Sequence, residues 1–229
     1  MIKENDVTYV DVRFTDPRGK MQHLSQHVDT INEETLEEGF MFDGSSIAGW
    51  KAINESDMLL KPDLYRAFMD PFFAQPTLAL FCDVLEPSSG QPYSRDPRST
   101  AKAAIAHMAS TGVADTAFFG PEAEFFLFED VKMDVSMNRG YYEVDSSEGP
   151  YNSAKNYDEG NLGHRPGIKG GYFPVPPVDS GQDVRSEMLS VMADMGVPVE
   201  KHHHEVAPSQ HELGMKFGEL IQTADNLQL

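Results

Sequence analysis

The segment FFGPEAEFFLFED, residues 118–130, places two carboxylates in the middle of an apolar, strand-like run. Glu122 and Glu124 are two positions apart, and residues at this spacing point to the same face of a β-strand. Two like charges side by side repel each other unless a cation lies between them. The segment therefore predicts a strand that presents two acids toward a positively charged group.

The segment HHHEVAPSQHE, residues 202–212, is rich in histidine and glutamate. It does not match the HExxH pattern of zinc proteases, which needs two histidines four positions apart on one helical face. Pro208 would also interrupt a helix here. We expect a strand, a turn and a second strand on which Glu205 and Glu212 converge. A solvated hairpin tip is the alternative when the segment is considered alone.

Glu122, Glu124, Glu205 and Glu212 together form an oxygen-rich set. Carboxylates suit hard divalent ions such as Mg²⁺ or Mn²⁺ better than zinc. Paired hard ions bridged by carboxylates are typical of phosphoryl transfer. Residue types and spacing alone indicate a carboxylate metal site for one or two ions. For His202 to His204 we expect a structural role beside the acids rather than ligation.

Composition limits the class of protein. The 229 residues include 37 acidic and 18 basic side chains, a net formal charge of −19, which argues against a surface for nucleic acid or for an anionic membrane. The sequence has no apolar run near the length of about 18 residues that a membrane span needs, and its N-terminus lacks the apolar region of a secretory signal. With a single cysteine, Cys82, an intramolecular disulfide is excluded, so we expect a cytoplasmic protein in which Cys82 is a buried apolar side chain.

The early part of the chain has the pattern of a β-rich domain. An alternating run at residues 10–14 and a second run at residues 22–28 flank the turn sequence DPRG at residues 16–19, which predicts a β-hairpin. FMFDGSSIAGW, residues 40–50, is too rich in Gly and Ser for us to expect regular structure. The apolar sequence TLALFCDV predicts a strand at residues 77–84.

Residues 86–96, EPSSGQPYSRD, have the composition of a linker. The linker ends in an N-cap aspartate followed by Pro97 at the first helical position, so a helix should begin there. We place a domain boundary here, with a small β-rich domain at residues 1–90 and a larger α/β part at residues 91–229.

Residues 131–180 are crowded with Gly, Pro, Tyr, Asn and Asp, so we expect one long loop. Asp179 and Ser180 are expected to cap a helix that Gly196 ends. We expect the apolar stripe of this helix to lie in the core: Val184, Met188, Val191, Met192 and Met195.

Several long segments of the chain resemble a known family. They are MFDGSSIAGW with INESDM (41–50 and 53–58), FFGPEAEFFLFED (118–130), IKGGYFPVPPVDS (168–180) and VEKHHHEVAPSQHEL (199–213). In this order they resemble bacterial type I glutamine synthetase. The resemblance implies an α+β fold, in which a small N-terminal β-grasp-like domain is followed by the first part of a glutamine-synthetase-type α/β catalytic domain.

The resemblance also implies roles for individual acids. Glu124, Glu205 and Glu212 would hold one Mg²⁺ or Mn²⁺, and Glu122 would contribute to a second ion, so that the two acids of the first segment each face a different cation. Glu200 matches a nucleotide-contacting position.

Asp43, in FDGSS, matches the aspartate that acts on ammonium across a subunit boundary, and Asp57, in ESDM, matches a second cross-subunit acid. An N-cap or turn acid is the alternative for Asp43. In this family the N-terminal domain of one subunit completes the active site of its neighbour in a ring, and two rings stack into a dodecamer. The implied partners are copies of the same chain, with glutamate, ammonia and ATP.

The implied reaction is the ATP-dependent ligation of ammonia to glutamate in nitrogen assimilation. The γ-carboxylate of glutamate takes the terminal phosphate of ATP, and ammonia displaces phosphate from γ-glutamyl phosphate to give glutamine. Metal ions neutralise the phosphates and hold donor and acceptor in line. Asp43 would bind ammonium by charge and then accept its proton.

The sequence departs from the family at its ends. The family's polypeptide is considerably longer, and this chain stops at ADNLQL with its apolar positions still in helical register, so we expect a truncated chain that is inactive alone. By the same comparison, we expect the start to be clipped, with most of the family's leading helix missing before Asp6. Three interpretations stay open: a piece of an active glutamine synthetase, a non-catalytic interaction chain that joins a full-length ring, and a relative that ligates another amine to glutamate. The presence of Asp43 and the four glutamates favours the first over the third.

Overall fold

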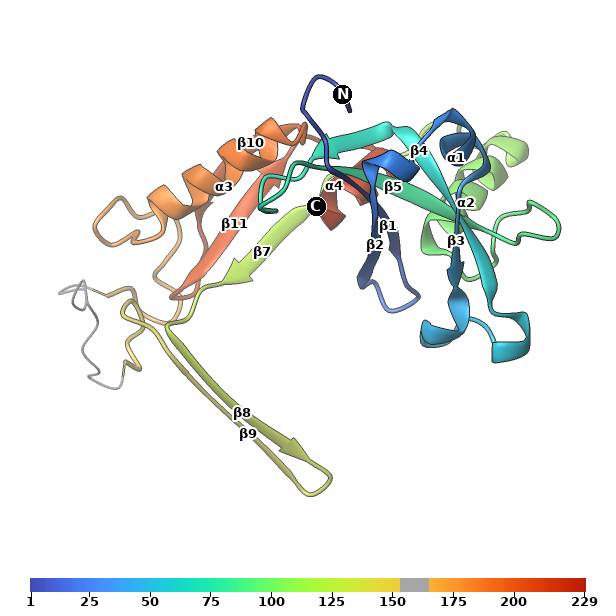
Figure 1. Cartoon of the computed structure of the whole chain (residues 1–229). Helices are drawn as coiled ribbons and strands as arrows, with labels where there is room; N and C mark the ends of the chain where they lie inside the picture. The colour runs from blue at the N-terminus through green and yellow to red at the C-terminus, as the bar shows by residue number, and fades with distance from the viewer. Residues whose placement is uncertain (153–164) are drawn as a thin grey trace. The chain divides into compact units, whose positions relative to one another are not determined.

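The computed structural model describes residues 1–152 and 165–229 (Figure 1). The chain folds as two compact units: the first unit is Met1–Phe119 with Phe217–Leu229, and the second unit is Gly120–Lys216. No helix in the described ranges is long and apolar enough to span a membrane.

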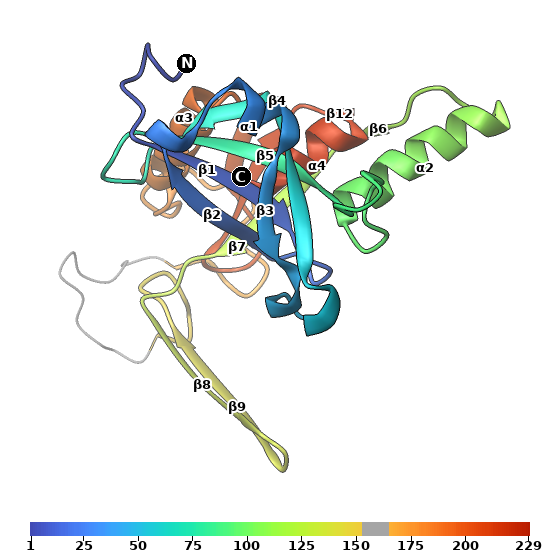
Figure 2. The same cartoon turned by 45° about the vertical axis from the view of Figure 1, so that its right-hand side comes forward.

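The first unit contains most of the strands. In chain order its main elements are β1 (Tyr9–Thr15), β2 (Met21–His27), α1 (Glu33–Glu38), β3 (Phe40–Asp43), β4 (Asp57–Met69), β5 (Thr77–Leu85), α2 (Pro97–Thr111), β6 (Phe118–Phe119), β12 (Gly218–Glu219) and α4 (Leu220–Gln228). A five-stranded sheet has the order β2-β1-β5-β4-β3 (Figure 2). β1 and β5 are parallel, the other neighbours in this sheet are antiparallel, and β6 pairs with β12 in a separate ladder.

The hairpin predicted from the alternating pattern is confirmed as β1 and β2. Its turn is held by Asp16, whose Oδ1 accepts hydrogen bonds from the N–H groups of Arg18 (2.8 Å) and Lys20 (3.0 Å). Gly19 adopts a φ of 83°, a left-handed conformation that costs glycine little. The predicted strand at residues 77–84 is confirmed as β5.

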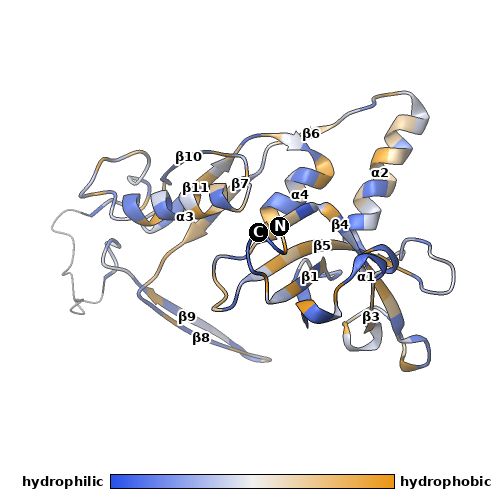
Figure 3. Ribbon diagram, turned by 45° about the horizontal axis from the view of Figure 1, so that its top comes forward, coloured by the Kyte–Doolittle hydropathy of each residue, from blue (hydrophilic) through white to orange (hydrophobic). Residues whose placement is uncertain are grey.

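Alternate residues of this sheet build the apolar core. Val12, Leu60 and Val84 are completely buried, and Figure 3 shows the apolar colouring that follows β5. Cys82 is buried as expected. Burial raises the pKa of the Cys82 thiol far above its ordinary value, which makes it a poor nucleophile.

A polar cluster lies on the opposite face of β1. Asp11 is buried, accepts hydrogen bonds from Arg13 Nε (2.7 Å) and Ser25 Oγ (2.6 Å), and lies 2.7 Å from His23 Nδ1. Burial pushes the pKa of Asp11 upward, but the hydrogen bonds from Ser25, His23 and Arg13 outweigh burial and hold this pKa below its usual value.

The segment at residues 40–50 is more regular than its composition suggested, so that expectation is wrong. Phe40–Asp43 forms β3, which pairs with the start of β4, and a 3₁₀ turn follows at Gly44–Ser46. Pairing with β4 supplies the strand hydrogen bonds that the local Gly-Ser content does not predict. Asp43 lies directly opposite Asp57 in this ladder.

The predicted helix after the linker is confirmed as α2. The carboxylate of Asp96 accepts hydrogen bonds from the N–H groups of Arg98 (3.3 Å) and Ser99 (3.0 Å), and Pro97 stands at the first helical position. Gly112 ends the helix in the left-handed conformation, with a φ of 70°.

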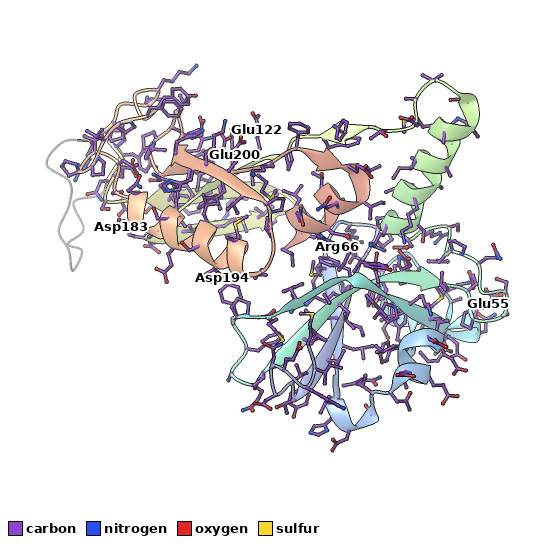
Figure 4. All side chains as sticks on the ribbon, turned by 90° about the horizontal axis from the view of Figure 1, so that it is seen from above. Glu55, Arg66, Glu122, Asp183, Asp194 and Glu200 are labelled. Atoms are coloured by element: carbon purple, nitrogen blue, oxygen red, sulfur yellow. The ribbon has the colours of Figure 1, made fainter. Side chains whose placement is uncertain are left out.

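Arg98 also stands at the centre of an ionic cluster in the first unit. Its guanidinium donates to Asp63 (2.6 Å), to Asp83 (2.6 Å) and to both carboxylate oxygens of Asp225 (3.1 Å). Arg66 of β4 donates to Asp225 as well (3.2 Å), and Figure 4 shows Arg66 beside α4. The cluster therefore fastens α4 to β4, β5 and α2.

The second unit holds the carboxylate-bearing strands. Its elements are β7 (Glu122–Phe126), β8 (Asp130–Ser136), β9 (Arg139–Asp145), α3 (Gln182–Asp194), β10 (Val199–His204) and β11 (Gln210–Met215). A three-stranded antiparallel sheet has the order β10-β11-β7. The predicted strand, turn and strand around Pro208 are thus confirmed.

The long loop expected at residues 131–180 is wrong in its first part, where β8 and β9 form a hairpin that leads away from the end of β7 (Figure 1). Its strands alternate between a charged face, with a Lys132–Glu143 pair at 3.1 Å, and an apolar face. The apolar face is exposed: Val131 (58%), Met133 (75%), Val135 (73%) and Tyr142 (77%). Residues 153–164 of the expected loop lie outside the described residues.

The expected cap and core stripe of α3 are also wrong in detail. Gly181 is the N-cap, and Asp179 accepts hydrogen bonds from the Gly181 N–H (3.1 Å) and from Arg185 Nη2 (2.5 Å). Arg185 is the fully buried side chain of this helix, whereas Val184 is 48% exposed and the methionines are half-buried. The sheet face that packs against α3 carries His202 and His211, and the helix places Arg185 against them rather than a stripe of methionines.

Candidate metal centre

The register of the three-stranded sheet brings a histidine and two acids into one row. His203 of β10 lies opposite Glu212 of β11, and Glu212 lies opposite Glu124 of β7. Directly opposed residues of an antiparallel sheet share a face and have side chains close together. Glu122, two positions before Glu124, lies on the same face.

Glu205, just after β10, completes a compact group on this face. His203 Nδ1 lies 3.6 Å from Glu205 Oε1, and His203 Nε2 lies 3.4 Å from Glu212 Oε2. One ligand atom from each of His203, Glu205 and Glu212 lies within 4.8 Å of the others. Within the described ranges, these atoms are spaced closely enough to surround a single cation.

The electrostatics of this face favour a cation. Burial raises the pKa of Glu212, and the charges of Glu122 and Glu205 raise it further, while His203 acts in the opposite direction. Crowded carboxylates of this kind are stabilised when a divalent ion neutralises them. Oxygen donors in excess over nitrogen donors suit Mg²⁺ or Mn²⁺. The residues present therefore fit such an ion.

Hydrogen bonds orient two of these carboxylates. Glu124 Oε2 accepts from Gln210 Nε2 (2.8 Å), and Glu205 Oε2 accepts from the N–H of Val206 (2.8 Å). Glu122 lies opposite Gly214, where a Cβ atom would come within 2.8 Å of Lys201 Cγ. The missing side chain at Gly214 thus leaves room for the Lys201 stem, which packs against this position of β11.

The opposite face of the sheet carries a buried polar network under α3. Arg185 Nη1 lies 2.7 Å from His211 Nδ1, and Arg185 Nε donates to His202 Nδ1 (3.2 Å). His204 is hydrogen-bonded to the buried Glu148. Burial, with the charge of Arg185, lowers the pKa of His211 to about 4, so this imidazole is neutral at pH 7. The histidines at 202, 204 and 211 therefore support the sheet from behind.

Strand alternation separates His203 from His202 and His204, although one common structural role was expected for all three. On a strand, His202 and His204 point away from the face that His203 shares with the acids. The sequence signal that could have singled out His203 is its position two residues before Glu205, because residues at this spacing on a strand share a face. Gln210 was not predicted, because its contact with Glu124 joins residues far apart in the sequence.

Glu200, Asp43 and Asp57 are not members of the group formed by His203, Glu205 and Glu212. Glu200 is exposed on β10 at an irregularity between Val199 and Lys201, and Figure 4 labels it together with Glu122 from the other outer strand of this sheet.

Asp43 and Asp57 belong to the first unit, where they face each other across β3 and β4. Asp43 Oδ1 accepts hydrogen bonds from the Ser45 N–H (2.8 Å) and Ser45 Oγ (2.6 Å), and these bonds lower its pKa. In this structure Asp43 therefore makes the contacts of an N-cap, as the alternative interpretation predicted. A polar cavity of about 700 Å³ lies beside Asp57 and is also lined by Lys51 and Glu86.

The five-stranded sheet of the first unit and the carboxylate face of the second define a β-grasp protein with a partial catalytic domain that carries a cluster of one histidine and several acids. Residues 6–87 match the family model for the glutamine synthetase beta-grasp domain, and residues 94–229 match the model for the glutamine synthetase catalytic domain. The chain belongs to the glutamine synthetase family.

Individual relatives agree with this assignment. The chain is 70% identical over 228 residues to a glutamine synthetase of Azospirillum brasilense and 60% identical over 228 residues to one of Rhizobium meliloti, matches that cover 100% of this chain and 49% of each relative. A Plasmodium falciparum glutamine synthetase structure superposes with a TM-score of 0.85 at 26% identity, over 99% of this chain and 45% of that one. The chain thus spans about half the length of the curated relatives it matches.

Proposed function

We propose that this chain supplies part of an active site that ligates ammonia to glutamate with ATP, through γ-glutamyl phosphate, to give glutamine. The observation that supports this most strongly is the row of His203, Glu212 and Glu124 with Glu205 on the same sheet face. Membership of the glutamine synthetase family supports this proposal for the carboxylate face. The substrates in this proposal are glutamate, ammonia and ATP.

In this proposal Glu124, Glu205 and Glu212 hold one Mg²⁺ or Mn²⁺, and Glu122 contributes to a second. When bound, the ions neutralise phosphate charge during phosphoryl transfer. The protein's part is to fix the carboxylates, which it does through the sheet register and the hydrogen bonds of Glu124 and Glu205.

We assign the ammonium step to Asp43, with Asp57 beside it. A carboxylate in its charged form attracts ammonium and accepts a proton from it. The lowered pKa of Asp43 supports the first part of this role, the attraction of ammonium by charge, because it favours the ionised carboxylate. In a homo-oligomer, a dodecamer in the resemblance, these aspartates would act on the glutamates of a neighbouring subunit, and Glu200 would contact the nucleotide.

We also propose domains at residues 1–90 and 91–229, a cytoplasmic location, and no glutamine synthesis by the 229-residue chain alone. The second ion has only Glu122 among the assigned ligands, and a single lost charge-stabilising contact can cost about 10²-fold or more in rate. The alternative is a non-catalytic chain that joins an oligomer.

Mn²⁺ binding to the purified chain tests the metal centre. Glu212→Gln should weaken the binding, whereas Asp183→Asn, at an exposed position of α3, should leave it unchanged. Equal Mn²⁺ affinities in the wild-type chain and the Glu212→Gln variant would refute the assigned ligands. Hydroxamate formation from glutamate, ATP and hydroxylamine tests the expected inactivity of the chain alone, since turnover would contradict an incomplete site.

A further inference from the structure

Gln210 is the first residue of β11 and follows the tight connection from β10. A residue outside the hairpin holds this connection in place: Ser209, which is 1% exposed and has a φ of 63°, donates through Oγ to Ser146 Oγ (2.6 Å). The Ser209 carbonyl accepts from the N–H of Leu127, just beyond β7 (3.0 Å). The backbone that carries Gln210 is therefore tied to the strand that carries Glu124.

The backbone of Gln210 makes two hydrogen bonds across the connection. Its N–H donates to the Ala207 carbonyl (3.2 Å), and its carbonyl accepts from the N–H of Glu205 (2.8 Å). The second bond links Gln210 directly to a proposed metal ligand.

The side-chain amide of Gln210 is fixed in orientation as well as in place. Its Oε1 accepts from the N–H of Ala207 (3.0 Å), and its Nε2 donates to Glu124 Oε2 (2.8 Å). A backbone N–H can only donate, so the oxygen of the amide must face Ala207 and the NH₂ group must face the carboxylate. The turn itself thus determines that Gln210 offers Glu124 a donor.

We propose that Gln210 is a positioning residue for the metal centre, which holds the Glu124 carboxylate in its metal-binding orientation through Oε2. The inference rests on the proposed function, because it assumes that Glu124 is a metal ligand. Residues that hydrogen-bond to metal ligands orient them and raise affinity, and their loss typically costs about 10–100-fold in metal affinity. Glu205 receives the corresponding hydrogen bond from a backbone N–H, which no side-chain substitution removes.

The test measures Mn²⁺ dissociation constants of the 229-residue chain from the electron paramagnetic resonance signal of free Mn²⁺. Gln210→Met keeps the length of the side chain and removes the amide, and it should weaken binding about 10-fold. The matched control is Gln75→Met, at an exposed position in the first unit, which should leave the dissociation constant unchanged.

A double-mutant comparison separates positioning from general loss of structure. In a chain that already carries Glu124→Ala, Gln210→Met should add nothing, because Gln210 acts through Glu124. If Gln210→Met weakens Mn²⁺ binding equally in both backgrounds, it acts by loosening the turn, and the positioning role is refuted.

Two further outcomes are distinguishable. If Glu212→Gln weakens Mn²⁺ binding but Gln210→Met leaves it unchanged, the positioning role alone is refuted. A chain whose Mn²⁺ affinity is unaffected by Glu212→Gln refutes the metal centre and the positioning role together.

Discussion

Replacing Arg185 by Met probes how the second unit supports its carboxylate face from behind. The Arg185 side chain is fully buried and donates to Asp179 Oδ2 at 2.5 Å, with His211 Nδ1 at 2.7 Å. Asp179 is itself only 5% exposed. The substitution keeps most of the apolar stem and leaves Asp179 as a buried charge without its cation.

Removing one partner of a buried ion pair costs about 3–5 kcal/mol, because the remaining charge is uncompensated. A unit of this size has a urea m-value of about 2 kcal/mol/M, so a loss of about 3 kcal/mol lowers the unfolding midpoint by about 1.5 M. The variant Arg185→Met/Asp179→Asn has no unpaired charge and should recover a large part of this loss.

Urea unfolding followed by circular dichroism measures these midpoints. Lys169→Met, at an exposed position of the same unit, is the control for loss of a positive charge and should unfold with the wild type. An unchanged midpoint for Arg185→Met would refute the reasoning. A double variant as unstable as Arg185→Met would show that the loss comes from packing or from the histidine contacts rather than from Asp179.

Further substitutions test other parts of the molecule. Asp11→Asn should reduce stability at neutral pH and flatten its acid dependence. The Asp11 carboxylate has a lowered pKa in the folded protein, so it stabilises the fold at pH values above its unfolded-state pKa of about 3.9, and this contribution is lost as the pH falls through the folded-state pKa. Wild type and variant whose melting temperatures change in parallel with pH would contradict this. Leu60→Ala should cost about 2–5 kcal/mol in denaturant unfolding, since Leu60 is fully buried, whereas Tyr65→Ala, at 97% exposure, serves as the near-neutral control. Met133→Thr, at 75% exposure on β8, should change the unfolding free energy by less than about 0.5 kcal/mol, and a larger loss would mean that the apolar hairpin face is covered.

Local sequence signals located much of the framework. The β1–β2 hairpin follows from alternation and from a turn whose aspartate satisfies nearby N–H groups. The start of α2 follows from an N-cap and a proline, and its end from Gly112. Family motifs fixed the α+β class and the β-grasp domain. Composition was misleading in two places. The segment around β3 is rich in Gly and Ser, but pairing with β4 made it a strand, and β8 and β9 pair with each other inside a stretch whose composition predicted a loop.

For the candidate centre, the sequence by itself determined that Glu122 and Glu124 share a strand face and that Glu205 and Glu212 flank a short turn, because a strand alternates every two residues. Tertiary structure alone decided that β11 lies between β10 and β7 in the register that aligns His203, Glu212 and Glu124. It also decided that Arg185 is buried against histidines on the far face, and that Gln210 meets Glu124. Register between strands distant in the chain depends on packing and hydrogen bonds summed over the whole sheet, and no short segment contains that information.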